Sequence, residues 1–431
     1  MSEPQEPSIS SVQSSVLDLP PCCIEFSPLH PRHFVVGTYF LDKKNETGEQ
    51  TPEKVGDELK SESETALSDN NKSSQHRTGS IEVYHMIPEK EEAVLIQTTL
   101  QQSAILDLHF HQSADATGAA TLVAVTSTGT VTFHQLDPIS RPLEPLVNLA
   151  TQRFDSISEE DGILLLHCSW HPTEQDLLAV TTSDGRVLLA RVDLKNCKIK
   201  AYREIPIENQ LENWFVALTP TEKTAEDDSA FTIFSGGDDS VMRWVSCVIK
   251  ANDTGEADDE EDLGLQLPYP PASLKNQHMA GVTSILPLST KLHDGSTLLV
   301  SGSYDDMIRV FAFKPQHETY GLRSCRLLSE ATLGGGVWRI KVMHADSGAI
   351  TLLVSCMYAG TRIVRLLLGD GSGDGMEFEI LARFEEHKSM NYGSEFVPGF
   401  SRAGDNGGAQ ERLIVSTSFY DRLMCVWRSP V

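Results

Sequence analysis

Short apolar runs that end in small residues and turns recur along the whole chain. The clearest copy, at 301–311, reads Ser-Gly-Ser-Tyr-Asp-Asp-Met-Ile-Arg-Val-Phe. It predicts a strand end, an acidic turn and a second strand with alternating apolar and polar positions. Copies at 235–245 and 417–427 keep the same spacing. If Asp305 marks the turn, its equivalents in the other copies are Thr78, Thr128, Asp184, Asp239, Ala359 and Asp421.

These turn positions define a repeat that predicts the fold. Successive gaps run from 50 residues (78 to 128) to 66 residues (239 to 305), and a second apolar run precedes each copy. One strand pair cannot bury both of its faces, whereas stacked four-stranded sheets bury them against one another. We therefore predict an all-β fold, a seven-bladed WD-repeat β-propeller. The strand at 11–19 should complete the last blade, because Trp427 lies almost at the C-terminus.

Composition and charge bound the organisation and the partners. We expect residues 11–431 to form a single propeller, residues 1–10 to be a disordered N-terminus, and two acidic, apolar-poor stretches at about 42–77 and 251–262 to be disordered insertions. The formal net charge of -26 argues against nucleic acid and anionic membranes as partners. The sequence shows no long apolar run and no signal-peptide pattern. We expect a cytoplasmic protein that acts as a monomer.

The chain carries no familiar catalytic or metal-binding signature. None of its eight cysteines forms a Cys-x-x-Cys pair, and most fall inside predicted strands. We interpret them as reduced and buried, and we predict no metal and no cofactor. There is also no Gly-x-Ser-x-Gly and no His-Glu-x-x-His. Any chemistry must therefore come from residues that the fold brings together.

In a propeller, the turns between second and third strands share one face with the loops that lead into the innermost strands. Several aromatic and acidic residues should therefore approach the mouth of the central channel: Trp214, Trp338, Tyr392, Tyr304, Asp305, Tyr420 and Asp421. Such aromatics would suit an organic cation through cation–π contacts. Packing between blades explains the same set equally well.

Three further features allow both a chemical and a structural interpretation. His387 and Ser389 would point the same way in an extended segment, which is the minimum for an activated nucleophile, but propeller repeats often use such a histidine inside the blade. Asp421 follows Phe419 and Tyr420, unlike the turn aspartates Asp239 and Asp305, whose structural role is the simpler interpretation. The glycines at 334–336 favour either a tight turn or backbone donors for an oxyanion.

Several stretches together resemble one family, the WD-repeat diphthine methyl ester hydrolases of diphthamide biosynthesis, also catalogued as diphthine methyltransferase. The resemblance covers the second half of the chain well and the first half thinly. It is carried by residues 212–217 (Glu-Asn-Trp-Phe-Val-Ala), 278–285, 334–341 (Gly-Gly-Gly-Val-Trp-Arg-Ile-Lys), 355–360, 389–393 (Ser-Met-Asn-Tyr-Gly) and 418–423 (Ser-Phe-Tyr-Asp-Arg-Leu).

The resemblance implies hydrolysis of a methyl ester on an intermediate attached to elongation factor two, which is then the expected partner. Diphthine carries a trimethylammonium group, which an acidic aromatic mouth could hold. On this hypothesis His387 is the base, Asp421 orients it, and Ser389 or an activated water attacks. The substrate-binding residues are Trp214, Trp338, Arg339, Tyr392, Tyr420, Gly335 and Gly336. The alternative is a non-catalytic adaptor that presents one face to a protein partner.

Overall fold

The computed structural model describes residues 9–42, 76–114, 118–207, 209–224, 228–250, 263–315, 317, 323–403 and 410–430. The segment expected to be a disordered N-terminus lies outside these ranges up to residue 8, and the expected insertion at 251–262 lies wholly outside them. The other expected insertion, 42–77, is outside them except at its two ends, which are strand.

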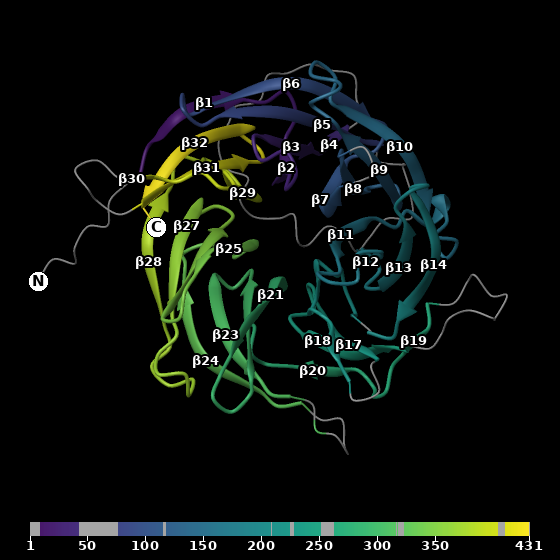
Figure 1. Ribbon diagram of the computed structural model, residues 1–431, viewed down its shortest axis with the longest axis vertical. Helices are drawn as coiled ribbons and strands as arrows, with labels where there is room; N and C mark the ends of the chain where they lie inside the picture. The colour runs from purple at the N-terminus through teal and green to yellow at the C-terminus, as the bar shows by residue number, and fades with distance from the viewer. Residues whose placement is uncertain are drawn as a thin grey trace, which may run out of the picture.

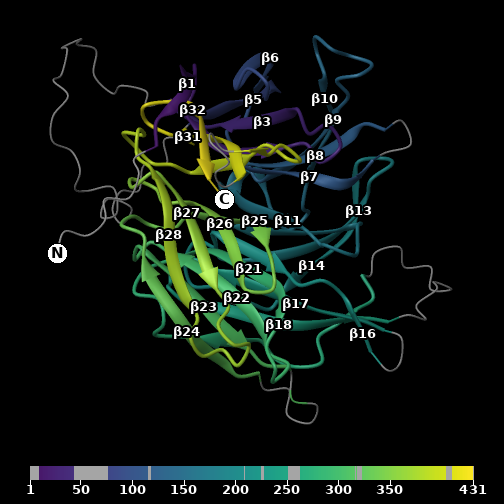
Figure 2. The same ribbon diagram turned by 60° about the vertical axis from the view of Figure 1, so that its left-hand side comes forward.

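Seven antiparallel sheets stand around a common axis, as Figure 1 shows in face view and Figure 2 after a turn of 60°. The first three blades are regular or nearly so. Blade 1 contains β2 (Pro21–Phe26), β3 (His33–Thr38), β5 (His76–Ile87) and β6 (Glu92–Gln101), with β4 (Phe40–Asp42) paired to β5. Blade 2 contains β7 (Ile105–Ala114), β8 (Ala120–Thr126), β9 (Thr130–Leu136) and β10 (Leu146–Arg153). Blade 3 contains β11 (Leu165–Trp170), β12 (Leu177–Thr182), β13 (Val187–Asp193) and β14 (Lys198–Ile205).

The remaining blades complete the ring. Blade 4 contains β15 (Phe215–Leu218), β17 (Ser229–Gly236) and β18 (Met242–Ile249), flanked by β16 (Glu222–Lys223), β19 (Leu265–Gln266) and β20 (Ala272–Leu274). Blade 5 contains β21 (Val282–Lys291), β22 (Thr297–Ser303), β23 (Met307–Phe313) and β24 (Cys325–Thr332). Blade 6 contains β25 (Arg339–Ala345), β26 (Ala349–Ser355), β27 (Thr361–Leu367) and β28 (Glu377–Phe384). Blade 7 contains β29 (Gly393–Phe396), β31 (Gln410–Ser418), β32 (Leu423–Pro430) and β1 (Ser11–Val16), with β30 (Arg402–Ala403) beside β31.

The predicted all-β, seven-bladed propeller closed by the N-terminal strand is confirmed. Strand β1 pairs antiparallel with β32, so that Ser11 lies opposite Trp427 and Val16 opposite Leu423. One side chain also joins this blade to the next: Gln13 Nε2 donates to the Ala93 carbonyl at 3.1 Å, and the Ala93 amide donates to Gln13 Oε1 at 2.7 Å. The amide group of Gln13 thus substitutes for a backbone pair between β1 and β6.

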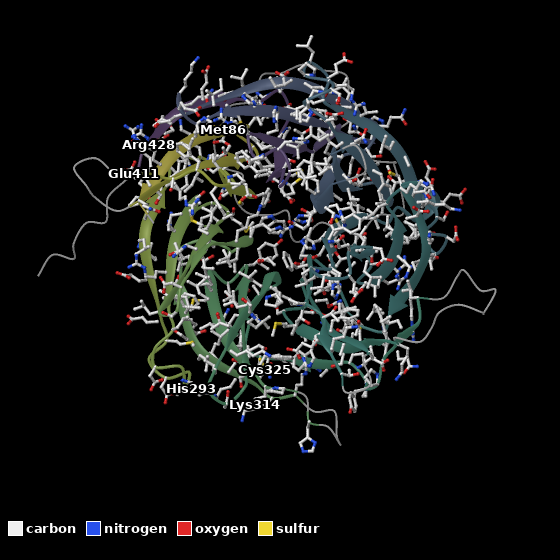
Figure 3. All side chains as sticks on the ribbon, in the orientation of Figure 1. Met86, His293, Lys314, Cys325, Glu411 and Arg428 are labelled. Atoms are coloured by element: carbon white, nitrogen blue, oxygen red, sulfur yellow. The ribbon has the colours of Figure 1, made fainter. Side chains whose placement is uncertain are left out.

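Clusters of buried apolar side chains lie between neighbouring blades; Figure 3 shows the described side chains on the ribbon. The cluster between blades 7 and 1, for example, packs Met86 against Met424 and Val415. Inner strands of adjacent blades contact one another around the ring, and this places β2, β7, β11, β15, β21, β25 and β29 along the central channel. The described residues include one 3-10 turn (Glu159–Asp161), and they contain no helix long and apolar enough to cross a membrane.

One expected turn position is wrong. Thr78 lies inside β5, opposite Phe40 of β4, because the hairpin of blade 1 extends beyond the usual turn. Asp239, Asp305 and Asp421, by contrast, lie where the second and third strands of their blades are joined.

Candidate active site

Hydrogen bonds tie the loops that lead into the inner strands to the turns beside them. The Met279 amide donates to Asp305 at 2.8 Å, and the Lys388 amide donates to Asp421 at 2.9 Å. In blade 4 the Asp238 amide donates to the Glu212 carbonyl at 3.0 Å. Loops and turns from blades 4, 5 and 7 are therefore on one face of the disc, as the repeat predicted.

Aromatic rings from four blades form a continuous cluster on this face. Trp338 lies at its centre, with ring centroids 5.6 Å from Trp214, 4.9 Å from Tyr392 and 6.0 Å from Tyr304. Tyr392 continues the series to Phe419 at 5.6 Å, and Phe419 reaches Tyr420 at 5.0 Å. The structure thus brings together Trp214, Trp338, Tyr392 and Tyr420. We call this set, with Tyr304 and Phe419, the aromatic mouth.

A carboxylate lies against the aromatic mouth. Trp214 Nε1 donates to Asp238 Oδ1 at 2.6 Å, and burial raises the pKa of Asp238 in spite of this bond. Gly281 keeps the space open, since a Cβ at this position would lie 2.8 Å from the Asp238 carboxylate and 2.9 Å from the ring of Tyr304. An acid beside indole and phenol rings is the arrangement that attracts an organic cation.

Arg339 lies directly below the aromatic mouth, at the start of β25. Its guanidinium carbon lies 4.7 Å from the ring centroid of Trp338 and 5.2 Å from that of Phe215. Nη1 donates to the backbone carbonyls of Thr283 (3.1 Å) and Trp338 (3.0 Å). Burial lowers the pKa of Arg339, although Asp107 acts in the opposite direction.

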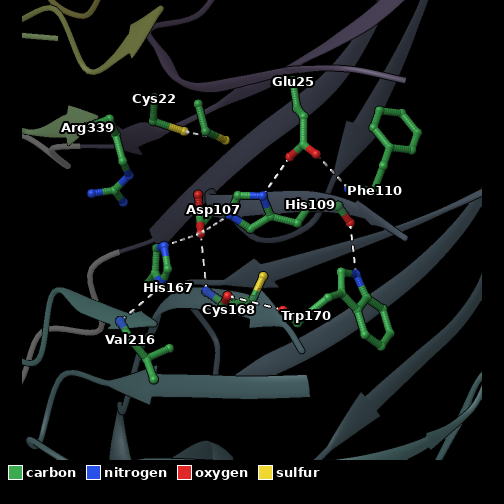
Figure 4. Close-up of polar contacts among 12 residues, drawn as sticks. Cys22, Glu25, Asp107, His109, Phe110, His167, Cys168, Trp170, Val216 and Arg339 are labelled. Atoms are coloured by element: carbon green, nitrogen blue, oxygen red, sulfur yellow. Dashed lines mark hydrogen bonds and ion pairs between the residues drawn. The ribbon is translucent and has the colours of Figure 1, made fainter. Parts of the chain in front are cut away.

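Deeper in the channel, four ionisable side chains form a connected row, shown in Figure 4. His109 Nδ1 lies 2.6 Å from Glu25 Oε2, and its Nε2 lies 3.2 Å from Asp107 Oδ2. His167 Nε2 approaches the same Asp107 oxygen at 3.5 Å. The Cys168 amide adds a further donor to this oxygen at 3.2 Å. We call Glu25, His109, Asp107 and His167 the channel tetrad.

The two histidines of the channel tetrad differ in charge, because their partners differ. Burial opposes a charge on His109, but Asp107 and Glu25 outweigh it and raise its pKa to about 10, so this ring is an imidazolium at neutral pH. His167 is different, because its Nδ1 accepts a hydrogen bond from the Val216 amide at 3.3 Å. Its proton therefore lies on Nε2, facing Asp107, and burial lowers its pKa well below the usual value.

Asp107, His109 and His167 offer donor atoms within 4.8 Å of one another, a spacing that a metal ion could bridge. The hydrogen bonds do not fit this use. A metal needs the Nε2 lone pair of His167, yet Nδ1 is already an acceptor, so Nε2 must carry the proton in a neutral ring. The channel tetrad fits a network that holds protons better than it fits a metal centre.

A cavity of about 30 Å³ lies between the aromatic mouth and the channel tetrad, with Cys22, Asp107, His109, Arg339, Lys341 and Tyr392 among its lining residues. Its volume is enough for about two water molecules. Lys341 is paired with Glu395 in a short ion pair, which offsets its charge. A water-sized space with charged side chains in its lining therefore adjoins Tyr392 of the aromatic mouth.

His387 and Ser389 are not brought together as base and nucleophile. His387 Nε2 bonds Ser416 Oγ at 2.7 Å, and Trp427 Nε1 donates to the same oxygen at 2.9 Å. Ser389 Oγ instead donates to Asp421 Oδ1 at 2.8 Å and accepts from the Tyr420 amide at 2.9 Å. The expected pairing of His387 with Ser389 is therefore corrected, whereas Ser389 and Asp421 do meet.

Blade 5 repeats the arrangement of blade 7, and this explains the correction. His278 Nε2 bonds Ser301 Oγ at 2.8 Å, as His387 bonds Ser416. In both blades the residue after the histidine donates its amide to the turn aspartate. Because the same network occurs in two blades, its role is structural, and His387 and Asp421 first of all stabilise blade 7.

Gly335 and Gly336 have a steric reason to be glycine. A Cβ on Gly335 would lie 2.4 Å from the Cys356 carbonyl, and one on Gly336 would lie 2.6 Å from the sulfur of Met357. Both are buried, and within the described residues neither backbone amide has a hydrogen-bond acceptor. The tight-turn interpretation holds, and the two amides also remain candidates for binding an anion.

Three curated proteins are similar to this chain. It is 26% identical over 333 residues to the "Diphthine methyltransferase homolog" of Dictyostelium discoideum, covering 77% of this chain and 78% of the relative. It is 25% identical over 462 aligned positions to the "Diphthine methyltransferase" of Saccharomyces cerevisiae, covering 95% of each chain. The Schizosaccharomyces pombe protein of the same name is 24% identical over 275 residues, 62% of this chain and 65% of that one. The chain is thus related to proteins of this name, in line with the resemblance.

Other comparisons bear on the fold alone. No protein-family model matches the chain. A chain of the mitotic checkpoint complex aligns with a TM-score of 0.53 at 12% identity, covering 100% of this chain and 96% of that one. Saccharomyces cerevisiae Sqt1 aligns with a TM-score of 0.53 at 11% identity, covering 98% and 100%. These structural alignments support the propeller fold, but at such low sequence identity they say nothing about function.

Proposed function

We propose that this chain acts in diphthamide biosynthesis by hydrolysing the methyl ester of methylated diphthine on elongation factor two, before amidation. Similarity to the yeast protein over 95% of both chains supports the pathway. The substrate assignment is supported by the aromatic mouth with Asp238, which suits the trimethylammonium group of diphthine. The reaction is the finer part of the proposal.

Water is the nucleophile that this channel favours. The Ser389 hydroxyl is engaged by Asp421 and by the Tyr420 amide, whereas the cavity below Arg339 has room for water. A water oxygen adds to the ester carbonyl carbon, the carbon–methoxy bond breaks, and methanol leaves with one proton. A carboxylate and a second proton remain, and the amides of Gly335 and Gly336 are candidates to stabilise the intermediate oxyanion.

The face around the aromatic mouth suits a protein substrate. Four large apolar side chains are exposed there: Leu211 (50%), Met279 (83%), Tyr358 (57%) and Tyr420 (62%). They lie in loops and turns of blades 4 to 7, on the face that carries the site. Exposed apolar side chains gathered at one place mark contact surfaces. We call these four residues the rim.

Mass spectrometry of elongation factor two tests the proposal. Methylated-diphthine elongation factor two, incubated with the folded chain, should lose the mass of one methylene group from the modified residue, and methanol should appear. The Trp338→Ala variant should lose most of this activity, because it removes the ring at the centre of the aromatic mouth. Unchanged mass after prolonged incubation with folded protein would refute ester hydrolysis.

A non-catalytic adaptor is the second candidate, favoured by the structural use of His387 and by the exposed rim. An adaptor should bind elongation factor two with the same affinity whether or not the ester is present. The esterase should instead bind the esterified form more tightly than the unmodified one.

A further inference from the structure

We propose that Arg339 is the carboxyl-binding residue of this channel, and that the site takes a betaine-type group in which one carbon carries both a quaternary ammonium and a carboxyl or its ester. This inference rests on the proposed function and specifies its substrate. It assigns the ammonium to the aromatic mouth and the carboxyl to the guanidinium below it.

In the part of the chain that the structure describes, the Arg339 guanidinium forms no ion pair with a carboxylate. Arg243, Arg309 and Arg362 each form an ion pair with a carboxylate at 2.7 to 2.9 Å. Among the described residues no carboxylate oxygen lies within 4.0 Å of the Arg339 nitrogens, which meet only the carbonyls of Thr283 and Trp338 through Nη1. A guanidinium has five N–H donors, so most of its capacity to bind an anion is left.

Asp107 is the carboxylate that acts on Arg339 most strongly. Its Oδ2 atom already faces the imidazolium of His109, the N–H of His167 and the amide of Cys168. These donors compensate its charge within the channel tetrad. Asp107 therefore does not occupy the donors of Arg339, and it repels a ligand carboxylate less than an unpaired acid would.

The two proposed subsites are close together. The Trp338 ring lies against the Arg339 guanidinium at 4.7 Å and against Tyr392 at 4.9 Å. A quaternary ammonium on these rings lies a few ångströms from the guanidinium, and two cations this close repel unless an anionic or strongly polar group lies between them. A carboxyl on the carbon that carries the ammonium fills this place, so the geometry selects betaines over simple quaternary amines.

Direct binding to the full chain tests the inference without any turnover. Glycine betaine and choline are titrated separately, followed by tryptophan fluorescence and calorimetry, because both probes carry a trimethylammonium group and only betaine carries a carboxylate. Wild-type protein should bind betaine at least about tenfold more tightly than choline. Equal affinities, tighter binding of choline, or no binding of either probe at millimolar concentration would overturn the inference.

Variants of Arg339 separate the carboxyl contact from the aromatic contact. Arg339→Gln should weaken betaine binding by about tenfold or more while choline binding is kept or improved, and Arg339→Lys should lie between, since it keeps the charge but loses the planar fork. Arg365→Gln is the matched control, because Arg365 on β27 already pairs with Glu379 on β28. The thermal unfolding midpoint of each variant shows that the fold is intact. Unchanged betaine affinity in folded Arg339→Gln would overturn the inference.

Either proposal can fail while the other stands. If betaine binds through Arg339 but methylated elongation factor two is never hydrolysed, the inference stands and the esterase proposal fails. If the ester is hydrolysed and Arg339→Gln leaves both kcat and KM for the esterified protein unchanged, the esterase proposal stands and the inference fails.

Discussion

His387 stays neutral in the folded protein, because it is buried and already hydrogen-bonded to Ser416. Burial lowers its pKa to about 4, as it does for His278 in the equivalent network. The sign of the effect on stability follows. Between the unfolded pKa of about 6.5 and the folded pKa of about 4, the unfolded chain binds a proton that the folded chain does not, so acidification through this window destabilises the fold.

We predict that His387→Asn reduces this acid sensitivity. Asn209 is an internal precedent, since its Nδ2 reaches Ser235 Oγ at 3.3 Å in blade 4. The free energy of unfolding of wild type minus that of the variant should fall by at most roughly 3 kcal/mol between pH 6.5 and pH 4. Urea unfolding at both pH values measures it. His344→Asn, which makes the same change at an exposed histidine, is the control. Unfolding free energies of wild type and His387→Asn that fall in parallel between the two pH values would contradict the prediction.

The residues of the site were only partly predictable from the sequence. Trp338 and Tyr392 stood out because they lie at loop ends that the repeat aligns. Asp107, His109 and His167 were missed, because polar residues next to apolar ones are the ordinary pattern of a strand. A signal did exist: Asp107 with His109, and Arg339 with Lys341, are ionisable pairs two residues apart, which in an inner strand both face the channel. The partners within the channel tetrad depend on strand positions that the pattern does not fix.

Among the elements, β1 depends on contacts to both of its neighbours. It pairs with β32 along its length, and Gln13 bonds Ala93 of β6 in the adjacent blade. The sequence predicted the first contact from the missing outer strand of the last blade. It could not predict the second, because a polar outer strand offers several residues that could bridge to β6 and only the register selects Gln13.

We predict that Gln13→Ala costs about 2 kcal/mol of unfolding free energy, because it removes two hydrogen bonds and leaves the amide and carbonyl of Ala93 without these partners. Urea unfolding at pH 7 measures the change. Val12→Ala on the same strand is the control and should cost less, since Val12 is 47% exposed. Equal losses in the two variants would show that the bridge contributes nothing.

At the scale of the whole molecule, the propeller divides its surface into a face that carries the aromatic mouth and an opposite face. The rim residues lie on the first. Ile139 (80% exposed) and Leu143 (81%) are comparable apolar residues in the connection between β9 and β10, which lies on the other face. Ile139 and Leu143 are therefore an internal control for a docking surface formed by the rim.

We predict that the double variant Met279→Ala, Tyr358→Ala raises KM for methylated elongation factor two by about tenfold, because apolar contact area with the protein substrate is lost. The double variant Ile139→Ala, Leu143→Ala should leave this KM unchanged. Steady-state kinetics by mass spectrometry compares them. A similar rise in both would place the substrate elsewhere or indicate a general loss of stability.

The pairing of β1 with β32 joins two strands that lie more than 400 residues apart along the chain, since Ser11 is opposite Trp427. Contacts this distant in sequence form after local ones, because the entropy of closing the loop is lost before the contact stabilises the chain. Until this seam closes, β1 and the outer edge of β32 are unpaired strand edges to which another chain can add a strand. Closure of one seam is thus the step that protects the whole ring from aggregation.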